Sequence, residues 1–303
     1  MPSCSRRRFL SAAAAAAAAG PMAGPAAAAE PTAGAAEPPR FLVGVCDWMI
    51  LKRQKLGAFA LAGEIGADGV EVDMGGLGDR PTFDNKLADP VVREQFRAEA
   101  AARGVAICSI AMSGFYAQSF AERDGIERVV QDAIDTAASL NVATIFLPLG
   151  VRSDLVARPG LRPAVVARLR DAGRRAADAG VTIGIETALD ADGEAGLLDE
   201  IGSAAIRSCF NFADALQNGR DLHAELRRLG RDRIRQLHAS NRDGVRLADD
   251  PQIDLPAVKR TLDDMGWRGW LVIERSRDAA NPRDVKGNFG ENARTLKRVF
   301  QGG

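Results

Sequence analysis

The 303-residue sequence has few aromatic residues, few histidines and no excess of positive or negative charge. Phenylalanine, tryptophan and tyrosine make up 5% of it, with Tyr116 as the single tyrosine, and there are two histidines. Lysine and arginine together number 40, as do aspartate and glutamate, so the formal net charge is zero. Because a nucleic-acid groove normally leaves a basic excess, this balance argues against a nucleic-acid partner.

Cysteine is scarce as well, with four residues in the chain. Cys4 falls in the alanine-rich N-terminal segment, whereas Cys46, Cys108 and Cys209 lie within or beside apolar runs. Their spacing matches no zinc motif, and three is an odd number for a disulfide framework. Since free cysteine is among the most buried residue types, we expect three core thiols here and not a reactive cysteine.

No apolar run is long enough to cross a bilayer, so we expect no stable membrane span. The alanine run over 12–19 follows "SRRRFL", which is the twin-arginine export pattern, and precedes a small-residue cleavage site near Ala28 or Ala29. We therefore predict a twin-arginine signal peptide over residues 1–29 and a short linker over 30–39. The mature protein would be periplasmic or secreted, exported already folded by the twin-arginine translocase. A disordered alanine-rich tail is the alternative.

From residue 40 onward, the sequence alternates short apolar runs with longer amphipathic stretches. Each run is apolar throughout or nearly so, as expected of a parallel strand covered on both faces. The eight runs are Phe41–Cys46, Gly69–Val72, Val105–Ala111, Thr144–Leu147, Val181–Ile185, Ile206–Phe210, Ile234–Leu237 and Trp270–Ile273. Eight strand-then-helix units in about 260 residues predict an α/β fold, the (β/α)8 TIM barrel, over residues 40–303.

The stretches between the runs have helical periodicity. In "RPAVVARLRDAGRRAADAG", Val165, Leu169 and Ala172 recur at steps of three and four residues, and Gly180 stands where a C-terminal cap belongs. A doubly wound open sheet is the alternative fold. A nucleotide-binding sheet of that kind would carry a glycine-rich turn after its first strand, where this sequence has "DWMILKRQ".

Polar residues stand where the last four predicted strands end. Glu186 follows the fifth run, Asn211 the sixth, His238 the seventh and Glu274 the eighth. For any one of them, a helix cap or a loop contact is the simpler explanation. In a TIM barrel, however, the C-terminal strand ends form the active-site face, so four consecutive strands place these residues at one level.

Two glutamates that converge at one rim repel each other strongly in a partly dry site. A divalent cation removes that repulsion, and glutamate, asparagine and histidine can all be its ligands. The pattern therefore predicts a metal site made of Glu186, Asn211, His238 and Glu274, with Mn²⁺, Zn²⁺ or Mg²⁺ as the candidate ions.

These residues and their surroundings resemble the sugar phosphate isomerase/epimerase family, the xylose isomerase-like TIM barrels. The resemblance runs from about residue 41 to 300 and is clearest from "IGIET" onward, through "RQLHASNRDG" and "DLPAVKRTLDDMGWRGWLVIE". It implies a metal site on the last four strands and carries Glu186, His238 and Glu274 onto ligand positions. In "SCFNFADAL", Asn211 stands where the family has aspartate, and Asp214 where it has histidine or asparagine, so we expect weaker metal binding.

The substrate implied by the resemblance is a small sugar or glycoside. We expect Glu71, Tyr116, Asp214, Asn241 and Arg277 to contact it. We also expect the segment "GFYAQSF", which contains Tyr116 and two phenylalanines, to act as a lid that stacks on a sugar ring. For the arginine, a surface pair with Asp278 and Asp284 is an equal alternative.

The implied activity is that of a metal-dependent carbohydrate isomerase or epimerase. Glu186 and Glu274 would remove and return a proton next to the sugar carbonyl. A 3-keto-glycoside lyase or hydratase on the same barrel is the second interpretation, and a non-catalytic sugar-binding barrel is the third. A three-zinc DNA-repair endonuclease on this fold would need many histidines and a basic face, which this sequence lacks. Homo-oligomers are common for the fold, so a homo-oligomer is compatible with it.

Overall fold

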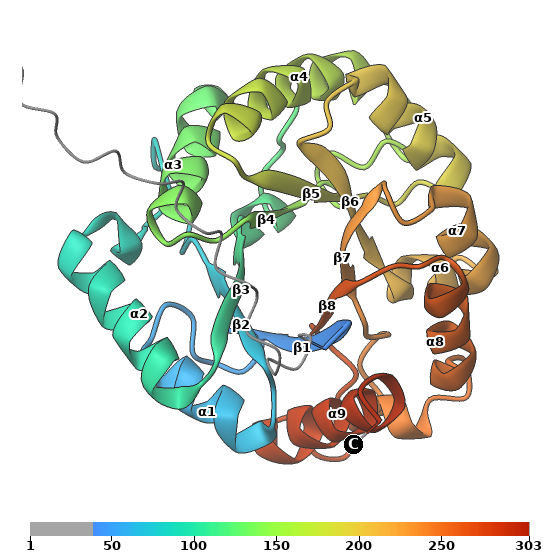
Figure 1. Ribbon diagram of the computed structural model, residues 1–303. Helices are drawn as coiled ribbons and strands as arrows, with labels where there is room; N and C mark the ends of the chain where they lie inside the picture. The colour runs from blue at the N-terminus through green and yellow to red at the C-terminus, as the bar shows by residue number, and fades with distance from the viewer. Residues whose placement is uncertain (1–38, 303) are drawn as a thin grey trace, which may run out of the picture. The chain divides into compact units, whose positions relative to one another are not determined.

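The computed structural model describes residues 39–302, and the eight predicted strands close into one parallel barrel. Neighbours in the barrel are neighbours in the chain, from β1 round to β8, which pairs with β1. The strands are β1 Phe41–Cys46, β2 Gly69–Asp73, β3 Ala106–Ala111, β4 Thr144–Pro148, β5 Thr182–Glu186, β6 Ile206–Asn211, β7 Ile234–His238 and β8 Gly269–Ile273. The predicted (β/α)8 fold is confirmed (Figure 1). The predicted signal peptide, 1–29, lies outside the described residues.

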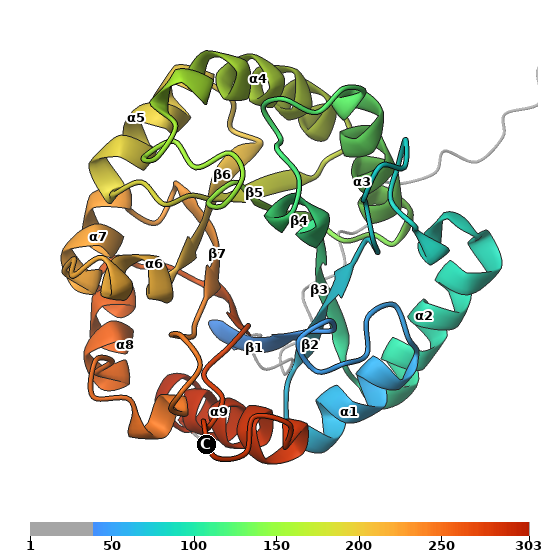
Figure 2. The ribbon, with the colours of Figure 1, turned by 180° about the vertical axis from the view of Figure 1, so that it is seen from behind.

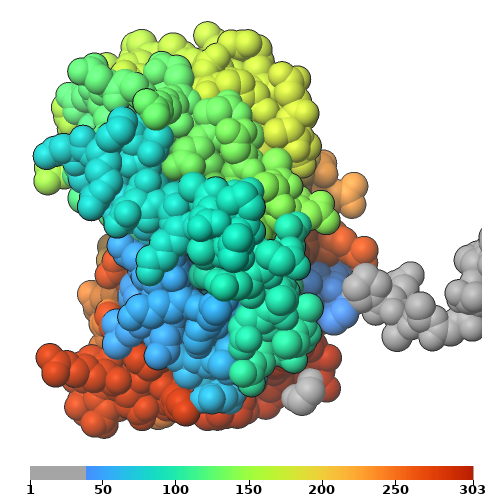
Figure 3. All heavy atoms as spheres, turned by 90° about the vertical axis from the view of Figure 1, so that its left-hand side faces the viewer, coloured from blue at the N-terminus to red at the C-terminus, as the bar shows by residue number. Residues whose placement is uncertain are grey.

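Helices alternate with the strands and surround the barrel (Figure 1). They are α1 Gly57–Ile65, α2 Pro90–Arg103, α3 Ile126–Ser139, α4 Arg162–Asp178, α5 Ala191–Ile201, α6 Phe212–Gln217, α7 Leu222–Leu229, α8 Leu255–Asp264 and α9 Val285–Phe300. Figure 3 shows α1 and α2 covering one side of the barrel. The glycine predicted to end α4 is found just after it, where Gly180 adopts a φ of +70° that other residues rarely take.

The apolar runs form strands because the barrel interior on one side and the helices on the other bury most of their residues. Every residue of β2 and β4 is buried, and the apolar faces of the helices close over the outside of the barrel. In five of the eight strands, the observed C-terminal end lies one residue beyond the predicted end. Glu186, Asn211 and His238 are therefore the last residues of β5, β6 and β7.

Two irregularities in the strand pairing change which side chains face the barrel interior. The register shifts between Val70 and Glu71 where β2 meets β3, and between Ser208 and Cys209 where β6 meets β7. Such bulges redirect the following side chains. Figure 2 views the barrel from the end where the strands terminate. Among residues 39–302, no helix is long and apolar enough to cross a membrane.

Candidate active site

Two buried glutamates lie at the C-terminal end of the barrel and share their hydrogen-bond donors. Glu186 is 6% exposed and Glu274, directly after β8, is 3% exposed. The Tyr116 hydroxyl donates to Glu274 Oε1 at 2.9 Å and lies 3.4 Å from Glu186 Oε1. Tyr116 comes from the short 3₁₀ turn Ser113–Tyr116 after β3. One phenol thus bridges the two carboxylates.

The amide of Asn211 bridges the same two glutamates from the other side. Its Nδ2 donates to Glu186 Oε2 at 3.0 Å and lies 3.4 Å from Glu274 Oε2. Its Oδ1 accepts the backbone N–H of Ala213 at 2.9 Å and so caps the start of α6. Because that cap requires the oxygen, the nitrogen must face the carboxylates.

His238 completes this group from β7 and is fully buried. Its Nδ1 lies 3.1 Å from Glu186 Oε2 and 3.9 Å from Glu274 Oε2, whereas its Nε2 faces Glu71 Oε1 at 3.2 Å. Burial by itself lowers the pKa of an imidazole. Contacts with Cys209, Glu71 and Glu186 nevertheless raise the pKa of His238 well above its ordinary value.

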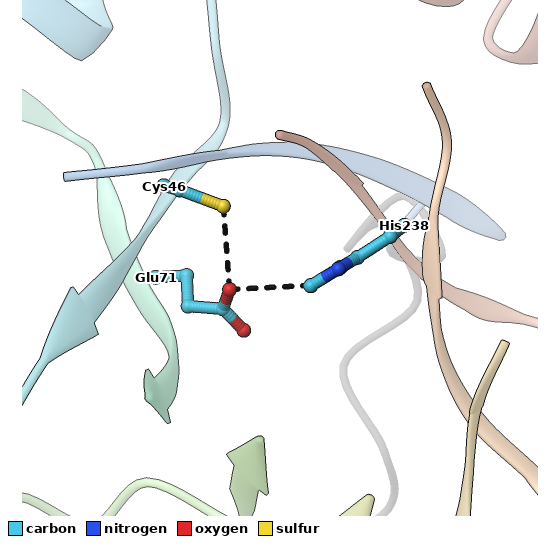
Figure 4. A group of neighbouring side chains, drawn as sticks. All are labelled: Cys46, Glu71 and His238. Atoms are coloured by element: carbon cyan, nitrogen blue, oxygen red, sulfur yellow. Dashed lines mark hydrogen bonds and ion pairs between the residues drawn. The ribbon is translucent and has the colours of Figure 1, made fainter. Parts of the chain in front are cut away.

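Glu71 lies in the barrel interior below His238, and four donors surround its carboxylate. They are Ser109 Oγ at 2.6 Å, Gln236 Nε2 at 2.7 Å, His238 Nε2 at 3.2 Å and Cys46 Sγ at 3.4 Å. Figure 4 shows the thiol and the imidazole both directed at the same oxygen of this carboxylate, Oε1. Burial alone would raise the pKa of Glu71, but His238 and the other donors hold it below its usual value.

Cys46, Cys108 and Cys209 are buried free thiols, as expected. Burial raises the pKa of Cys209 to about 12 and that of Cys46 well above its usual range, so both are protonated. The contact between Cys46 and Glu71 could not be expected from the sequence, because it depends on how the pleats of β1 and β2 align across the barrel.

The donor set partly fits the divalent ion that the fold family implies. One ligand atom each from Glu186, His238 and Glu274 lie within 4.8 Å of one another, so these groups could hold a metal ion. Asn211 presents its nitrogen to this group, and an amide N–H is not a metal ligand. Three protein ligands with an open position are typical of catalytic metal sites. Cys46, Glu71 and His238 form a second group of similar spacing.

Negative charge accumulates around the two glutamates. Burial, then the charge of Glu186, raises the pKa of Glu274. Burial, then Glu186, Glu194 and Glu274, raises the pKa of Asp214 to about 8, and Arg220 opposes this only weakly. Asp214 stands on the first turn of α6, three residues beyond Asn211. At neutral pH its carboxyl group is therefore mainly protonated.

Two further predicted contact residues are engaged by other loop residues. Asn241 is buried, and its Nδ2 donates to Asp250 at 2.9 Å and to Gln252 at 3.0 Å. Arg277 forms a bidentate ion pair with Asp243, from Nε to Oδ1 at 3.0 Å and from Nη2 to Oδ2 at 2.5 Å. The structure thus pairs Arg277 with Asp243 on the β7–α8 loop and not with Asp278 or Asp284.

Aromatic rings form one wall beside the glutamates. Trp48 stacks on Phe146 with 6.5 Å between ring centroids and 7° between planes, and Phe146 lies 4.5 Å from the His238 ring. This pair was not predicted from the sequence. The expected lid is only partly right, because Phe115 and Phe120 are 1% exposed and pack against each other in the core. Of that segment, Tyr116 is the aromatic residue that reaches the site.

Comparison with known proteins gives one family and a set of similar structures. A family model described as "Xylose isomerase-like TIM barrel" matches residues 59–299. No curated protein matches the chain. A xylose isomerase domain protein from Planctomyces limnophilus is 18% identical, with a TM-score of 0.66 over 88% of this chain and 100% of that one.

Two similar structures are named epimerases. D-psicose 3-epimerase from Clostridium cellulolyticum H10, solved with D-tagatose, is 13% identical, with a TM-score of 0.67 over 86% of this chain and 99% of that one. The 3-keto-D-glucoside 4-epimerase from E. coli is 17% identical, with a TM-score of 0.64 over 85% and 99%. At these identities the likeness shows the fold.

Proposed function

The chain belongs to the xylose isomerase-like TIM barrel family, and from this we propose that it is a metal-dependent carbohydrate isomerase or epimerase. The observation that carries the proposal is the pair of buried glutamates, Glu186 and Glu274, at the C-terminal end of the barrel. Such a pair is costly to bury, and it provides the two proton-transfer groups that this chemistry needs. The structural neighbours named as epimerases support the same class.

The two glutamates share the proton transfer. One removes the proton from the carbon next to the carbonyl, and the partner carboxylate returns a proton to the substrate. Return to the opposite face gives epimerisation, and return to the neighbouring carbon gives isomerisation. The Tyr116 hydroxyl, shared by both carboxylates, keeps their Oε1 atoms on the same side of the site.

Glu186, His238 and Glu274 would hold the divalent ion, which when bound would polarise the sugar carbonyl. Trp48, which is partly exposed and stacks on the buried Phe146, provides an apolar face against which a sugar ring can pack. Glu71 accepts a hydrogen bond from His238 Nε2 and so leaves Nδ1 directed at the two glutamates.

A lyase acting on 3-keto-glycosides is the second candidate. Proton removal next to a carbonyl leads to β-elimination when the next carbon bears a leaving group. A structural neighbour is named a 3-keto-D-glucoside 4-epimerase, which favours a keto-glycoside as substrate. We propose that the chain is exported, and an exported protein would meet glycosides more readily than sugar phosphates.

Proton exchange with solvent tests this function. The protein is incubated in D₂O with a panel of ketoses and 3-keto-glycosides, and deuterium at the carbon next to the carbonyl is followed by NMR. We expect Glu186→Gln and Glu274→Gln each to slow exchange by about 10²- to 10⁴-fold. The exposed Glu94→Gln on α2 serves as the control and should leave the rate unchanged.

Metal content is measured in parallel by elemental mass spectrometry. We expect one divalent ion per chain, reduced in Glu186→Gln and His238→Ala but not in Glu94→Gln. Release of the sugar's leaving group during exchange would identify the lyase. Sugar binding without exchange, retained in Glu186→Gln, would contradict both enzymes and leave a binding protein.

A further inference from the structure

The starts of β6, β7 and β8 surround a hollow at the opposite end of the barrel from the glutamates. Its volume is about 290 Å³. It is lined by Arg207, Arg231, Asp232, Ile234, Arg235, Gly266, Trp267 and Arg268. Four of these eight residues are arginines and one is an acid, in a chain whose net charge is zero. The excess of positive charge is therefore local.

The arginines of this hollow have few acidic partners. Asp232 pairs with its neighbour Arg231 at 3.4 Å. Within residues 39–302, Arg207, Arg235 and Arg268 take part in none of the ion pairs. Elsewhere on the barrel many arginines are paired, as Arg158 is with Glu122 at 2.6 Å. In the described part of the chain, three arginines without an acidic partner thus line one hollow.

Two of the guanidinium groups are held in place by oxygen atoms of the backbone and side chains. Arg235 donates from Nε to Thr144 Oγ1 at 2.8 Å and from Nη2 to the Ala143 carbonyl at 3.3 Å. Arg207 donates from Nε to the Ala204 carbonyl at 3.2 Å. Arg207 and Arg235 line the same hollow, and burial, then the charge of Arg207, lowers the pKa of Arg235.

We propose that this hollow binds a phosphate-type oxyanion, either inorganic phosphate or the phosphate group of a small phosphate ester. Guanidinium groups bind phosphate oxygens through paired N–H donors, and a dianion balances two cations at once. The four arginines, of which Arg207 and Arg235 are held by hydrogen bonds, supply more N–H donors than the carboxylate of Asp232 can accept. The site lies at the N-terminal strand ends, so it is separate from the glutamate cluster and independent of the proposed function.

Calorimetric titration of the full chain tests the site. Inorganic phosphate and glycerol phosphate are titrated separately, with sodium chloride at matched ionic strength as the blank. We expect one binding site per chain. The double substitution Arg207→Gln with Arg235→Gln should weaken binding by about tenfold to a hundredfold.

Two control variants test whether phosphate binding depends on this hollow. The first, Arg174→Gln with Arg228→Gln, removes the same charge from helices α4 and α7, where each arginine pairs with an aspartate, and should bind phosphate like the parent. The second, Glu186→Gln with Glu274→Gln, alters the other end of the barrel and should also bind normally. The exposed Arg268→Gln replaces the double variant if that variant does not fold, with weakening of several-fold expected.

Equal phosphate binding by the parent and the Arg207/Arg235 variant would overturn the proposal, as would no binding by the parent above the chloride blank. Tighter binding of glycerol phosphate than of inorganic phosphate would identify the ester as the ligand. The reverse order would identify free phosphate.

Discussion

The two ends of this barrel differ in charge, with arginines around the N-terminal ends of β6, β7 and β8 and two glutamates at the C-terminal end. Strand β6 begins near Arg207 and ends at Asn211, between the glutamates, and β7 begins near Arg235 and ends at His238. At the N-terminal end, guanidinium groups lie half-buried or exposed around a hollow. At the C-terminal end, Glu186 and Glu274 are almost fully buried.

Burial explains why the two ends are built differently. A cation that reaches water keeps much of its hydration, so the arginines persist with few partners. A buried carboxylate loses that hydration and must be compensated by donors. The Glu186 and Glu274 pair accordingly shares Tyr116, Asn211 and His238, and Glu71 beneath them has four donors. The buried carboxylates therefore have several hydrogen-bond donors each, whereas the arginines at the N-terminal end have few partners.

The largest effect is expected for Glu71→Gln. This change removes the buried negative charge that faces Nε2 of His238, which we expect to cost about 3 kcal/mol of unfolding free energy. It also removes the group that orients His238, so divalent-metal affinity should fall about 10- to 100-fold. Urea denaturation and metal titration calorimetry measure the two effects.

The orientation of the imidazole can be measured separately from stability. The chain has two histidines, so the ¹⁵N resonances of His238 are readily assigned beside those of His223. We expect Glu71→Gln to lower the pKa of His238, whereas Ser109→Ala, which removes one neutral donor to the same carboxylate, should shift it less. Unchanged His238 resonances and metal affinity in Glu71→Gln would show that Glu71 does not set the charge and orientation of His238. The proposed contrast between the two ends of the barrel would then fail.

The sequence predicted the residues at the C-terminal strand ends better than it predicted the contacts inside the barrel. Buried parallel strands have continuous apolar runs, and the residue that ends such a run must lie at the C-terminal face, so Glu186, His238 and Glu274 could be placed together. The contacts of Glu71 could not be predicted, because they depend on the bulge after Val70 and on alignment across the barrel. The short helix α6 was not evident either, and it fixes which atom of Asn211 faces the site.

A second, smaller effect is expected for Asn211→Asp. An aspartate can cap α6 with one oxygen and turn the other towards Glu186 and Glu274, which replaces an N–H donor by a fourth metal ligand. Metal affinity should rise about tenfold or more. Without metal, the added charge should destabilise the protein by about 1 to 3 kcal/mol, since it removes a donor and adds repulsion.

Thermal unfolding without Mn²⁺ measures the expected destabilisation of Asn211→Asp, and unfolding with Mn²⁺ measures the expected gain from tighter metal binding. Asn218→Asp, at the exposed end of α6, is the matched control; it loses one hydrogen bond to the Asp214 carbonyl, so it should be slightly destabilised, equally with and without Mn²⁺. An Asn211→Asp variant that is destabilised equally with and without Mn²⁺ would contradict a three-ligand metal site next to Asn211.

The third prediction concerns Glu194, a buried carboxyl group on α5 behind the rim. Thr187 donates to its Oε2 at 2.7 Å, and its Oε1 has no partner within the described part of the chain. Burial raises the pKa of Glu194 from 4.5 to about 7. The folded protein therefore binds this proton more tightly than the unfolded chain, and stability should fall as pH rises from 4.5 through about 7.

Glu194→Gln should remove that pH dependence. The variant should match the parent below pH 4.5 and exceed its stability by about 1 to 3 kcal/mol above the raised pKa. Urea denaturation across this range measures it, with the exposed Glu200→Gln as the comparison. Parallel stability curves for parent and Glu194→Gln would mean that Glu194 is ionised and paired in the folded protein.

The smallest effect is expected at the other end of the barrel, for Arg207→Gln. This change relieves repulsion with Arg235 and breaks no ion pair within residues 39–302, so it should alter stability by less than about 0.5 kcal/mol. Arg207→Gln should be slightly more stable than the parent at low salt, and the gain should vanish at high salt because salt screens the repulsion. Arg158→Gln, which loses the pair with Glu122, should instead be slightly destabilising at low salt. If Arg207→Gln destabilised the protein as much as Glu71→Gln does, the arginines would be as tightly bound into the fold as the carboxylates, and burial would no longer explain the contrast between the two ends.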